Sequence, residues 1–170
     1  DEQYSRYWKP EYDCNCPRDT DEIPFLQEAI DEWDLYSCKK VLDIGCGCGA
    51  FVYRWRRIGG EAEGITYLAE EATKAKEVFG IDLVVGDMHN LPWADETFDA
   101  VLLWDSLEHA ASMYIALCEA RRVTKKNGRG LIFIPGHIWQ YERYHIVLPT
   151  QAQMAHLLWL SGWTLYRLID

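Results

Sequence analysis

Two carboxylates and an imidazole stand close together near the middle of the chain, at Asp105, Glu108 and His109. If a helix begins at Asp105, these positions are spaced i, i+3 and i+4 and share one helix face. A histidine is a common general base near neutral pH when a proton must leave a hydroxyl or an ammonium group. The pattern therefore predicts a catalytic group around His109, or a set of side chains that only organises the start of the helix.

A further catalytic candidate, His145, lies in a segment rich in aromatic residues, with Trp139, Tyr141 and Tyr144 just before it. The segment follows an apolar run that ends at residue 134, and loops after strands often carry binding residues. It is interpreted as a loop that faces a substrate, with ordinary packing as the alternative.

A dense glycine run, Gly45-Cys46-Gly47-Cys48-Gly49-Ala50, follows the apolar segment 41–44. Glycines let the backbone turn tightly and approach a ligand closely, and the start of the following helix favours electron-rich groups. The run predicts a loop that binds a cofactor. A tight strand-to-helix connection without a ligand is the alternative.

The same run satisfies the fingerprint of dinucleotide-binding proteins, with Gly45, Gly47 and Ala50 at its three positions. That fingerprint expects an acidic residue about 20 positions later, where it holds a ribose hydroxyl. Thr66 stands there and offers only a hydroxyl. A nicotinamide-dependent oxidoreductase is therefore kept only as an alternative function.

The elements that position these residues alternate along the chain. Apolar runs predict strands at 41–45, 61–66, 81–85, 98–103, 131–134 and 163–169. Helical spacing predicts helices around 25–33 and at 50–58, 69–79, 111–124 and 150–161. This alternation predicts an α/β fold with a doubly wound, mostly parallel sheet that helices cover on both faces.

In such a sheet, ligands bind beyond the carboxyl ends of the strands. The segments that follow the predicted strands are 43–51, 64–68, 86–91, 103–109 and 135–145. Both the glycine run and the group around His109 belong to these segments. We therefore expect one site at this edge of the sheet.

Length and charge limit the partners. The chain has 170 residues, a formal charge of −10 and a pI near 4.9, which suits one acidic domain. Acidic surfaces repel phosphate backbones, so nucleic acid is disfavoured. The basic cluster Arg121, Arg122, Lys125, Lys126 and Arg129 is interpreted as the end of a helix. No apolar run approaches the roughly 20 residues of a membrane-spanning helix, so no membrane partner is expected.

Six cysteines stand at positions 14, 16, 38, 46, 48 and 118. Their spacing matches neither the disulfide framework of a small secreted scaffold nor the paired ligands of a zinc site. We therefore expect free thiols and a cytoplasmic location.

Several motifs in order resemble those of class I S-adenosylmethionine-dependent methyltransferases, in their small-molecule, type 11-like branch. The segment 41–49 is similar to the first motif of that family, including the acid before the glycines. The segment 86–92, Gly-Asp-Met-His-Asn-Leu-Pro, resembles the motif after the third strand, and 98–109 resembles the fourth-strand motif. The resemblance covers about residues 40–165 and implies a Rossmann-like methyltransferase fold with S-adenosyl-L-methionine as cofactor.

The resemblance also implies which residues hold the cofactor. In relatives, the aspartate at the position of Asp87 accepts the adenine amino group, and the backbone of the next residue contacts the ring. Asp43 would reach the amino group of the cofactor or would only cap the loop. The implied cofactor-binding set is Asp43, Gly45, Cys46, Gly47, Gly49, Thr66, Tyr67, Asp87, Met88 and Trp104.

Two features depart from the family pattern. Relatives commonly have Asp or Glu where Thr66 stands, and the minority with a Gly-Ile-Thr strand end place a glutamine shortly afterwards, which is not found here. The family also closes its sheet with a hairpin that needs another strand after 163–169. A reduced C-terminal hairpin or a truncated chain is therefore expected.

The acid-x-x-Glu-His arrangement also resembles that of methyltransferases that bind Mg²⁺ to orient a hydroxyl, where His137 or His145 would complete the set. Mg²⁺ prefers oxygen ligands, and Leu-Glu-His also occurs in relatives without metal. We therefore expect no metal. His89 and His156 are interpreted as surface or packing residues.

Together, these observations predict one methyltransferase domain over 1–170, with an N-terminal helical or lid segment at 1–37 and a cofactor-binding core at 38–170. The expected reaction transfers a methyl group from S-adenosylmethionine to an oxygen or nitrogen atom of a small-molecule acceptor. A catalytically silent subunit that binds the cofactor is a further alternative. The oligomeric state is left open.

Overall fold

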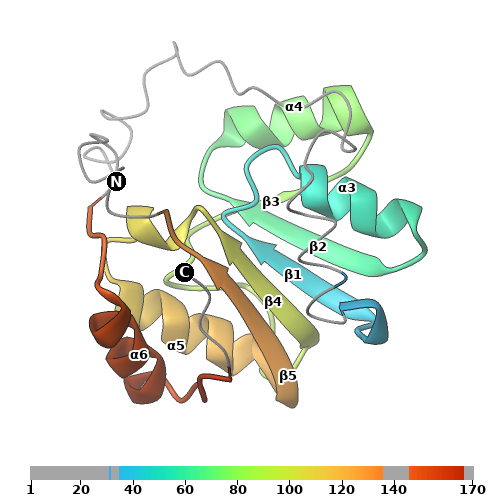
Figure 1. Ribbon diagram of the computed structural model, residues 1–170. Coiled ribbons are helices and arrows are strands. Elements are labelled where there is room, and N and C mark those ends of the chain that lie inside the picture. Colours follow the sequence, from blue (N-terminus) through green and yellow to red (C-terminus); the bar gives the residue numbers. More distant parts are fainter. Residues whose placement is uncertain (1–30, 32–34, 136–145, 167–170) are drawn as a thin grey trace.

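A five-stranded sheet forms the centre of the protein. The computed structural model describes residue 31 and residues 35–135 and 146–166. Within these ranges the strand order is β3-β2-β1-β4-β5, and all pairs are parallel (Figure 1). The strands are β1 (Lys40–Ile44), β2 (Glu61–Thr66), β3 (Val84–Val85), β4 (Phe98–Trp104) and β5 (Thr124–Phe133). The prediction of a doubly wound parallel sheet is confirmed.

Helices cover both faces of this sheet. Figure 1 shows α3 (Ala50–Arg57) and α4 (Ala69–Phe79) on one face, and α5 (Met113–Val123) with α6 (Gln151–Leu160) on the other. Two short 3₁₀ turns, η2 (Leu35–Ser37) and η3 (Leu107–His109), precede β1 and α5. Every predicted helix within the described residues is present, with ends that differ by at most two residues.

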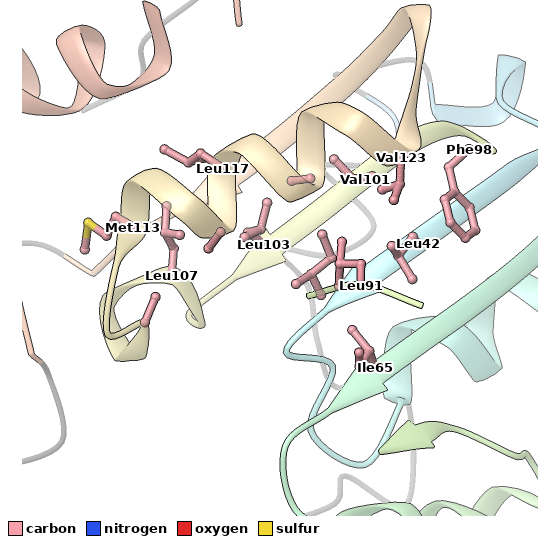
Figure 2. Packing of buried hydrophobic residues seen from close by; sticks show 14 of the residues in the cluster. Leu42, Ile65, Leu91, Phe98, Val101, Leu103, Leu107, Met113, Leu117 and Val123 are labelled. Carbon is pink, nitrogen blue, oxygen red and sulfur yellow. The ribbon is translucent and has the colours of Figure 1, made fainter. Parts of the chain in front are cut away.

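The strands divide their apolar residues between two cores because successive side chains point to opposite faces. On β1, Leu42 joins the core under α5, whereas Val41 joins the core under α3. Figure 2 shows Leu103 of β4 beneath Leu117 of α5. Burying each such side chain stabilises the fold by about 1.5–3 kcal/mol. Because both faces of the sheet are buried, polar functional groups are expected at the ends of the strands.

The chain after α5 differs from the prediction. Strand β5 starts at Thr124, directly after the helix, so Lys125, Lys126 and Arg129 lie on a strand. Only Arg121 and Arg122 form the predicted basic end of the helix. Between the pairs Phe98–Thr124 and Ala100–Arg129, β4 advances two residues and β5 advances five, so this polar first half bulges out of the regular pairing. The predicted strand 81–85 is also reduced to the two residues of β3.

The predicted strand at 163–169 is wrong for the residues described, because 163–166 form no strand. The indole nitrogen of Trp163 donates to the Leu117 carbonyl at 3.1 Å. Its ring lies 2.8 Å from the place where a Cβ on Gly130 would be. Trp163 thus fixes this segment against α5 and β5 by packing instead of by strand pairing.

Some predictions fall outside the described residues. They concern the helix around 25–33, most of the segment 1–37, and His137 and His145 with their aromatic neighbours. Cys38, Cys46 and Cys118 have free thiols, whereas Cys48 is disulfide-bonded. The expectation of free thiols is therefore wrong for Cys48. No helix of the described residues is long and apolar enough to span a membrane.

Candidate active site at the carboxyl ends of the strands

Loops from three strands meet at Gly45, the first residue after β1. A Cβ on Gly45 would lie 2.4 Å from Cβ of Ser106, which follows β4, and 3.6 Å from Cε of Met88, which follows β3. The Ser106 hydroxyl also donates to the Ile44 carbonyl at 2.8 Å. Gly45 has a φ of 77°, which favours glycine, and the close neighbours leave no space for a side chain. This junction brings the predicted cofactor and acceptor segments together.

Gly47, in the same loop, has open space around it. Its φ is 51°, and no atom lies within 4 Å of the place where a Cβ would be. Its N–H takes part in none of the backbone hydrogen bonds between described residues. Helix α3 follows, and its N-cap Gly49 provides no side-chain cap. Free N–H groups at a helix start suit a carboxylate, so the loop fits the amino-acid end of S-adenosylmethionine.

Asp43 is a buried carboxylate directly beneath this loop. Only 6% of its surface is exposed, and burial raises its pKa to about 7. Within the described residues its carboxylate accepts no hydrogen bond, which does not support the alternative of a loop cap. A cationic group placed beside Asp43 would favour its ionised form. The residue therefore fits the amino group of the expected cofactor.

Thr66 ends β2 and donates a hydrogen bond from its hydroxyl to Oε2 of Glu71. Glu71 lies in the first turn of α4 with 9% of its surface exposed, and burial raises its pKa although the Thr66 bond opposes that change. A carboxylate from the helix thus lies beside Thr66 at the end of β2. Sequence reasoning missed Glu71; the available signal was an acid five residues after Thr66 at the start of a helix.

Cys46 lies close to both buried acids. Burial raises the pKa of its thiol, and the charges of Asp43 and Glu71 raise it further. The thiol is therefore protonated at neutral pH and behaves as a small apolar side chain.

Asp87 follows β3 and has a side chain that is 54% exposed. Its Oδ1 accepts hydrogen bonds from the backbone N–H of His89 at 2.9 Å and from the His89 ring at 2.5 Å. Partial burial raises the pKa of Asp87, but the bonds from His89 outweigh burial and hold that pKa below its ordinary value. Oδ2 takes part in neither bond, so it can accept a donor such as the adenine amino group.

The other predicted cofactor residues lie around this junction. Met88 packs beside the core, with its Cε near Gly45. The ring of Trp104 stacks on that of Phe133 at a centroid distance of 4.7 Å and an angle of 12°, which forms a flat apolar wall at the ends of β4 and β5. Tyr67 is half-buried directly after β2.

The predicted helix face at Asp105, Glu108 and His109 is not formed as expected. The 3₁₀ turn η3 begins at Leu107, and Asp105 precedes it with a φ of 44°. A positive φ in a residue other than glycine is strained and is often found at functional sites. Asp105 is exposed, whereas Glu108 is fully buried, so the two carboxylates have different surroundings.

Glu108 and His109 are neighbours within η3. Nε2 of His109 lies 3.8 Å from Oε1 of Glu108, and 17% of the His109 side chain is exposed. Burial raises the pKa of Glu108 to about 7, and the charge of Asp105 adds to this effect. The Glu108 carbonyl accepts the N–H of Ile146 at 2.9 Å, which attaches the chain after residue 145 to this turn. His109 is thus partly exposed, whereas the Glu108 carboxylate beside it is buried.

Comparisons with known proteins agree with this site. A family profile described as a methyltransferase domain matches residues 42–132, more than half of the chain. The chain is 35% identical to malonyl-[acyl-carrier protein] O-methyltransferase of Erwinia billingiae over 96 residues, 55% of this chain and 38% of that protein. It is 30% identical to demethylmenaquinone methyltransferase of Tropheryma whipplei over 154 residues, 78% of this chain and 62% of that protein.

A solved structure shows the same fold. An S-adenosylmethionine-dependent methyltransferase from Archaeoglobus fulgidus superposes with a TM-score of 0.68 at 20% identity, over 82% of this chain and 68% of that one. The chain spans less than two thirds of the length of the two curated relatives named above. The profile match covers the loop beneath which Asp43 is buried and the segments that carry Asp87 and His109. The chain therefore belongs to the methyltransferase-domain family of class I enzymes, whose methyl donor is S-adenosylmethionine.

Proposed function

We propose that the protein transfers a methyl group from S-adenosylmethionine to an oxygen or nitrogen atom of a small molecule. The observation that carries this proposal is the meeting of three loops at Gly45. Met88, which follows Asp87, and Ser106, which precedes the turn of Glu108 and His109, both lie next to Gly45, and this supports a single site for cofactor and acceptor. The formal charge of −10 also favours a small acceptor over nucleic acid.

The residues of the glycine loop would hold the cofactor by charge and by shape. The N–H of Gly47 and the start of α3 would bind its carboxylate, and Asp43 would bind its amino group. Thr66 and Glu71 would bind ribose hydroxyls, and Oδ2 of Asp87 would accept the adenine amino group. The bound cofactor supplies a methyl group activated by a positive sulfur, so much of the rate would come from holding the acceptor in line with it.

The acceptor would lie beside η3. A hydroxyl or ammonium acceptor must lose a proton, and His109 is exposed enough to take it. Once ionised above its pKa of about 7, the buried Glu108 carboxylate favours a protonated His109. Glu108 is thus a positioning residue that supports the charge on His109. Trp104 and Phe133 would provide an apolar wall for the rest of the acceptor.

A carbon acceptor is the second candidate. The Tropheryma whipplei relative, named for demethylmenaquinone, matches 78% of this chain. Relatives of Cereibacter sphaeroides are named ubiquinone/menaquinone biosynthesis C-methyltransferases and are 30% identical over 69% of this chain. A base such as His109 would serve such a reaction equally by removing a proton from an activated carbon acid.

Two measurements test the proposal. Calorimetry should show binding of S-adenosylhomocysteine that weakens about tenfold in Asp87→Asn and stays unchanged in the matched control Asp82→Asn, whose exposed carboxylate pairs with Lys76. A donor with a ¹³C-labelled methyl group, incubated with extract, should then label a small molecule. The carbon shift in NMR separates methyl groups on oxygen, nitrogen and carbon. Binding without any transfer would favour a silent subunit, and NADH binding without S-adenosylhomocysteine binding would favour the oxidoreductase.

A further inference from the structure

His89 joins two parts of the site that are distant in sequence. Its backbone N–H and its Nδ1 both contact Oδ1 of Asp87, at 2.9 and 2.5 Å. On the other edge of the ring, Nε2 lies 3.0 Å from the backbone nitrogen of Ser112, which donates its N–H to it. Ser112 is the N-cap residue of α5. The His89 ring thus connects Asp87, the residue expected to bind adenine, with the start of α5, the helix that follows η3.

These contacts favour one tautomer of the neutral ring. Nε2 accepts the Ser112 N–H, so it carries no proton of its own. A neutral imidazole then has its proton on Nδ1, which donates to the Asp87 carboxylate. The bond to Ser112 and the bond to Asp87 therefore need the same tautomer, with the proton on Nδ1. The interpretation of His89 as a surface or packing residue is therefore too simple, because both ring nitrogens have defined partners.

The loop around His89 has a second attachment to the same helix. Arg122 donates from Nη2 to the Leu91 carbonyl at 2.9 Å and from Nη1 to the Trp93 carbonyl at 2.8 Å. Glu119 accepts the Leu91 N–H at 2.8 Å. Glu119 lies seven residues beyond Ser112, about 10 Å along the helix. Loss of the His89 contacts would therefore leave the loop attached and would change only the end that carries Asp87.

We propose that His89 is a positioning residue that couples adenine recognition by Asp87 to the start of α5 and, through it, to the acceptor side at η3. The two bonds to Oδ1 hold the carboxylate and leave Oδ2 for the adenine amino group, and the bond to Ser112 attaches this arrangement to the helix. Cofactor binding at Asp87 then tightens the bond at Ser112. This inference rests on the proposed function, because it assumes that adenine lies at Asp87.

The first test compares two variants that differ in hydrogen-bonding capacity. His89→Phe keeps a ring but loses both side-chain bonds, whereas the amide of His89→Gln can donate to one partner and accept from the other. Calorimetry should show S-adenosylhomocysteine binding about tenfold weaker in His89→Phe, with at least half of that loss in binding free energy recovered in His89→Gln. His156→Ala, at an exposed histidine of α6, is the matched control and should bind like the parent.

The second readout separates an effect through Asp87 from a general structural effect. S-Inosylhomocysteine has a carbonyl oxygen in place of the adenine amino group, so position 6 of its purine cannot donate to Oδ2. His89→Phe should weaken binding of S-adenosylhomocysteine several times more than binding of this analogue. A general loosening of the site would instead weaken both ligands by the same factor.

Hydrogen exchange measures the coupling to α5 directly and needs no turnover. In the parent, the Ser112 amide should exchange slowly, and more slowly still with S-adenosylhomocysteine bound. In His89→Phe, it should exchange at least tenfold faster, and the ligand should no longer protect it. Thermal unfolding within a few degrees of the parent would confirm that the variant folds.

The outcomes are distinct. If the parent does not bind S-adenosylhomocysteine, the proposed function fails. If the parent binds but His89→Phe keeps its affinity, or loses affinity equally for both ligands, the role of His89 is disproved. Unchanged ligand protection at Ser112 in His89→Phe would likewise overturn the coupling. If His89→Phe does not fold, the affinities for the two ligands are compared in His89→Gln and His89→Asn instead. Equal weakening of both ligands in these variants overturns the proposal.

Discussion

The cofactor side and the acceptor side of this site are built in different ways. On the cofactor side, the glycine loop is fixed by backbone groups, since the N–H groups of Gly45 and Cys46 both donate to the Ile65 carbonyl. On the acceptor side, a short 3₁₀ turn carries the buried side chain of Glu108 and the partly exposed His109. Both sides contain a buried acid whose pKa is raised to about 7, Asp43 in one and Glu108 in the other.

This difference indicates which side of the site can vary in sequence between relatives. A loop that binds through its backbone groups recognises any ligand with matching end groups, so relatives can share one cofactor. A side-chain arrangement on a short turn can be altered by single substitutions, which suits acceptors that differ between relatives. The predictions below test this contrast.

The largest expected effect comes from the two glycines of the loop. Gly45→Ala would place a Cβ 2.4 Å from Ser106 and should prevent stable folding or abolish S-adenosylhomocysteine binding. Gly47→Ala meets no atom within 4 Å, so its positive φ should lower the free energy of unfolding by only about 1 kcal/mol. Chemical denaturation and calorimetry measure both quantities.

Ligand binding by Gly47→Ala is the critical result. If the cofactor fills the open space at Gly47, this variant should lose at least tenfold in affinity although it folds. Normal affinity in Gly47→Ala would mean that the loop is only a connection between β1 and α3. The inference that backbone groups of this loop bind the cofactor would then be wrong.

On the acceptor side, His109→Asn should lower kcat about 100-fold and leave the affinity for S-adenosylhomocysteine within a factor of two. Glu108→Gln should lower kcat by a smaller factor, about tenfold. Because ionised Glu108 favours proton uptake by His109, kcat of the parent should rise as the pH increases through about 7. In Glu108→Gln, the part of that rise that comes from ionisation of Glu108 should be lost, and only the titration of the base itself should remain. An unchanged pH profile would contradict the positioning role of Glu108.

Asp43 should link ligand binding to proton release. Its folded-state pKa of about 7 lies above the ordinary value of 3.8, so stability is full below pH 4 and is lost as pH rises towards 7, by no more than about 4 kcal/mol. Asp43→Asn should therefore be more stable than the parent at pH 8 and should show no such pH dependence. The amino group of the ligand favours ionised Asp43, so binding near pH 6.5 should release a proton.

Calorimetry in buffers of different ionisation enthalpy measures that proton directly. The parent should release up to one proton on binding S-adenosylhomocysteine, and Asp43→Asn should release none. An equal release by both proteins would show that another group carries the charge.

The smallest effect is expected at the end of β2. Thr66→Val and Glu71→Gln should each weaken S-adenosylhomocysteine binding about threefold to tenfold, because neutral or missing acceptors hold ribose hydroxyls less well. A ligand analogue without the ribose 2′-hydroxyl should bind the parent and Glu71→Gln with similar affinity. If Glu71→Gln still binds that analogue more weakly than the parent does, Glu71 is not part of the ribose site.

The fold and the cofactor side could be predicted because their signals are local. Glycines in the loop after 41–44 and apolar runs of strand length depend on neighbouring residues, and the structure has β1, β2, α3 and α4 where those signals placed them. The motif around Asp87 is similarly continuous in sequence. Local backbone requirements are visible in a single sequence because only a few residue types satisfy them.

The contacts that complete the site could not be predicted, because they join residues through the tertiary fold. Glu71 is known as the partner of Thr66 only once α4 is packed on the sheet. His89 meets Ser112 across 23 positions of sequence, and no pattern marks either residue. The polar start of β5 was also missed, since Lys125 and Lys126 lack the apolar pattern of a strand.

Strand β5 has a consequence for how copies of this chain behave in solution. Among the strands that the structure describes, it lies at one edge of the sheet, and an open edge is a template on which another chain can pair. Lys125 and Lys126 are exposed in its first half, beside an irregular register with β4. Lysines and irregular pairing at an edge discourage such association, so we expect Lys125 and Lys126 to limit pairing of this edge with another copy of the chain.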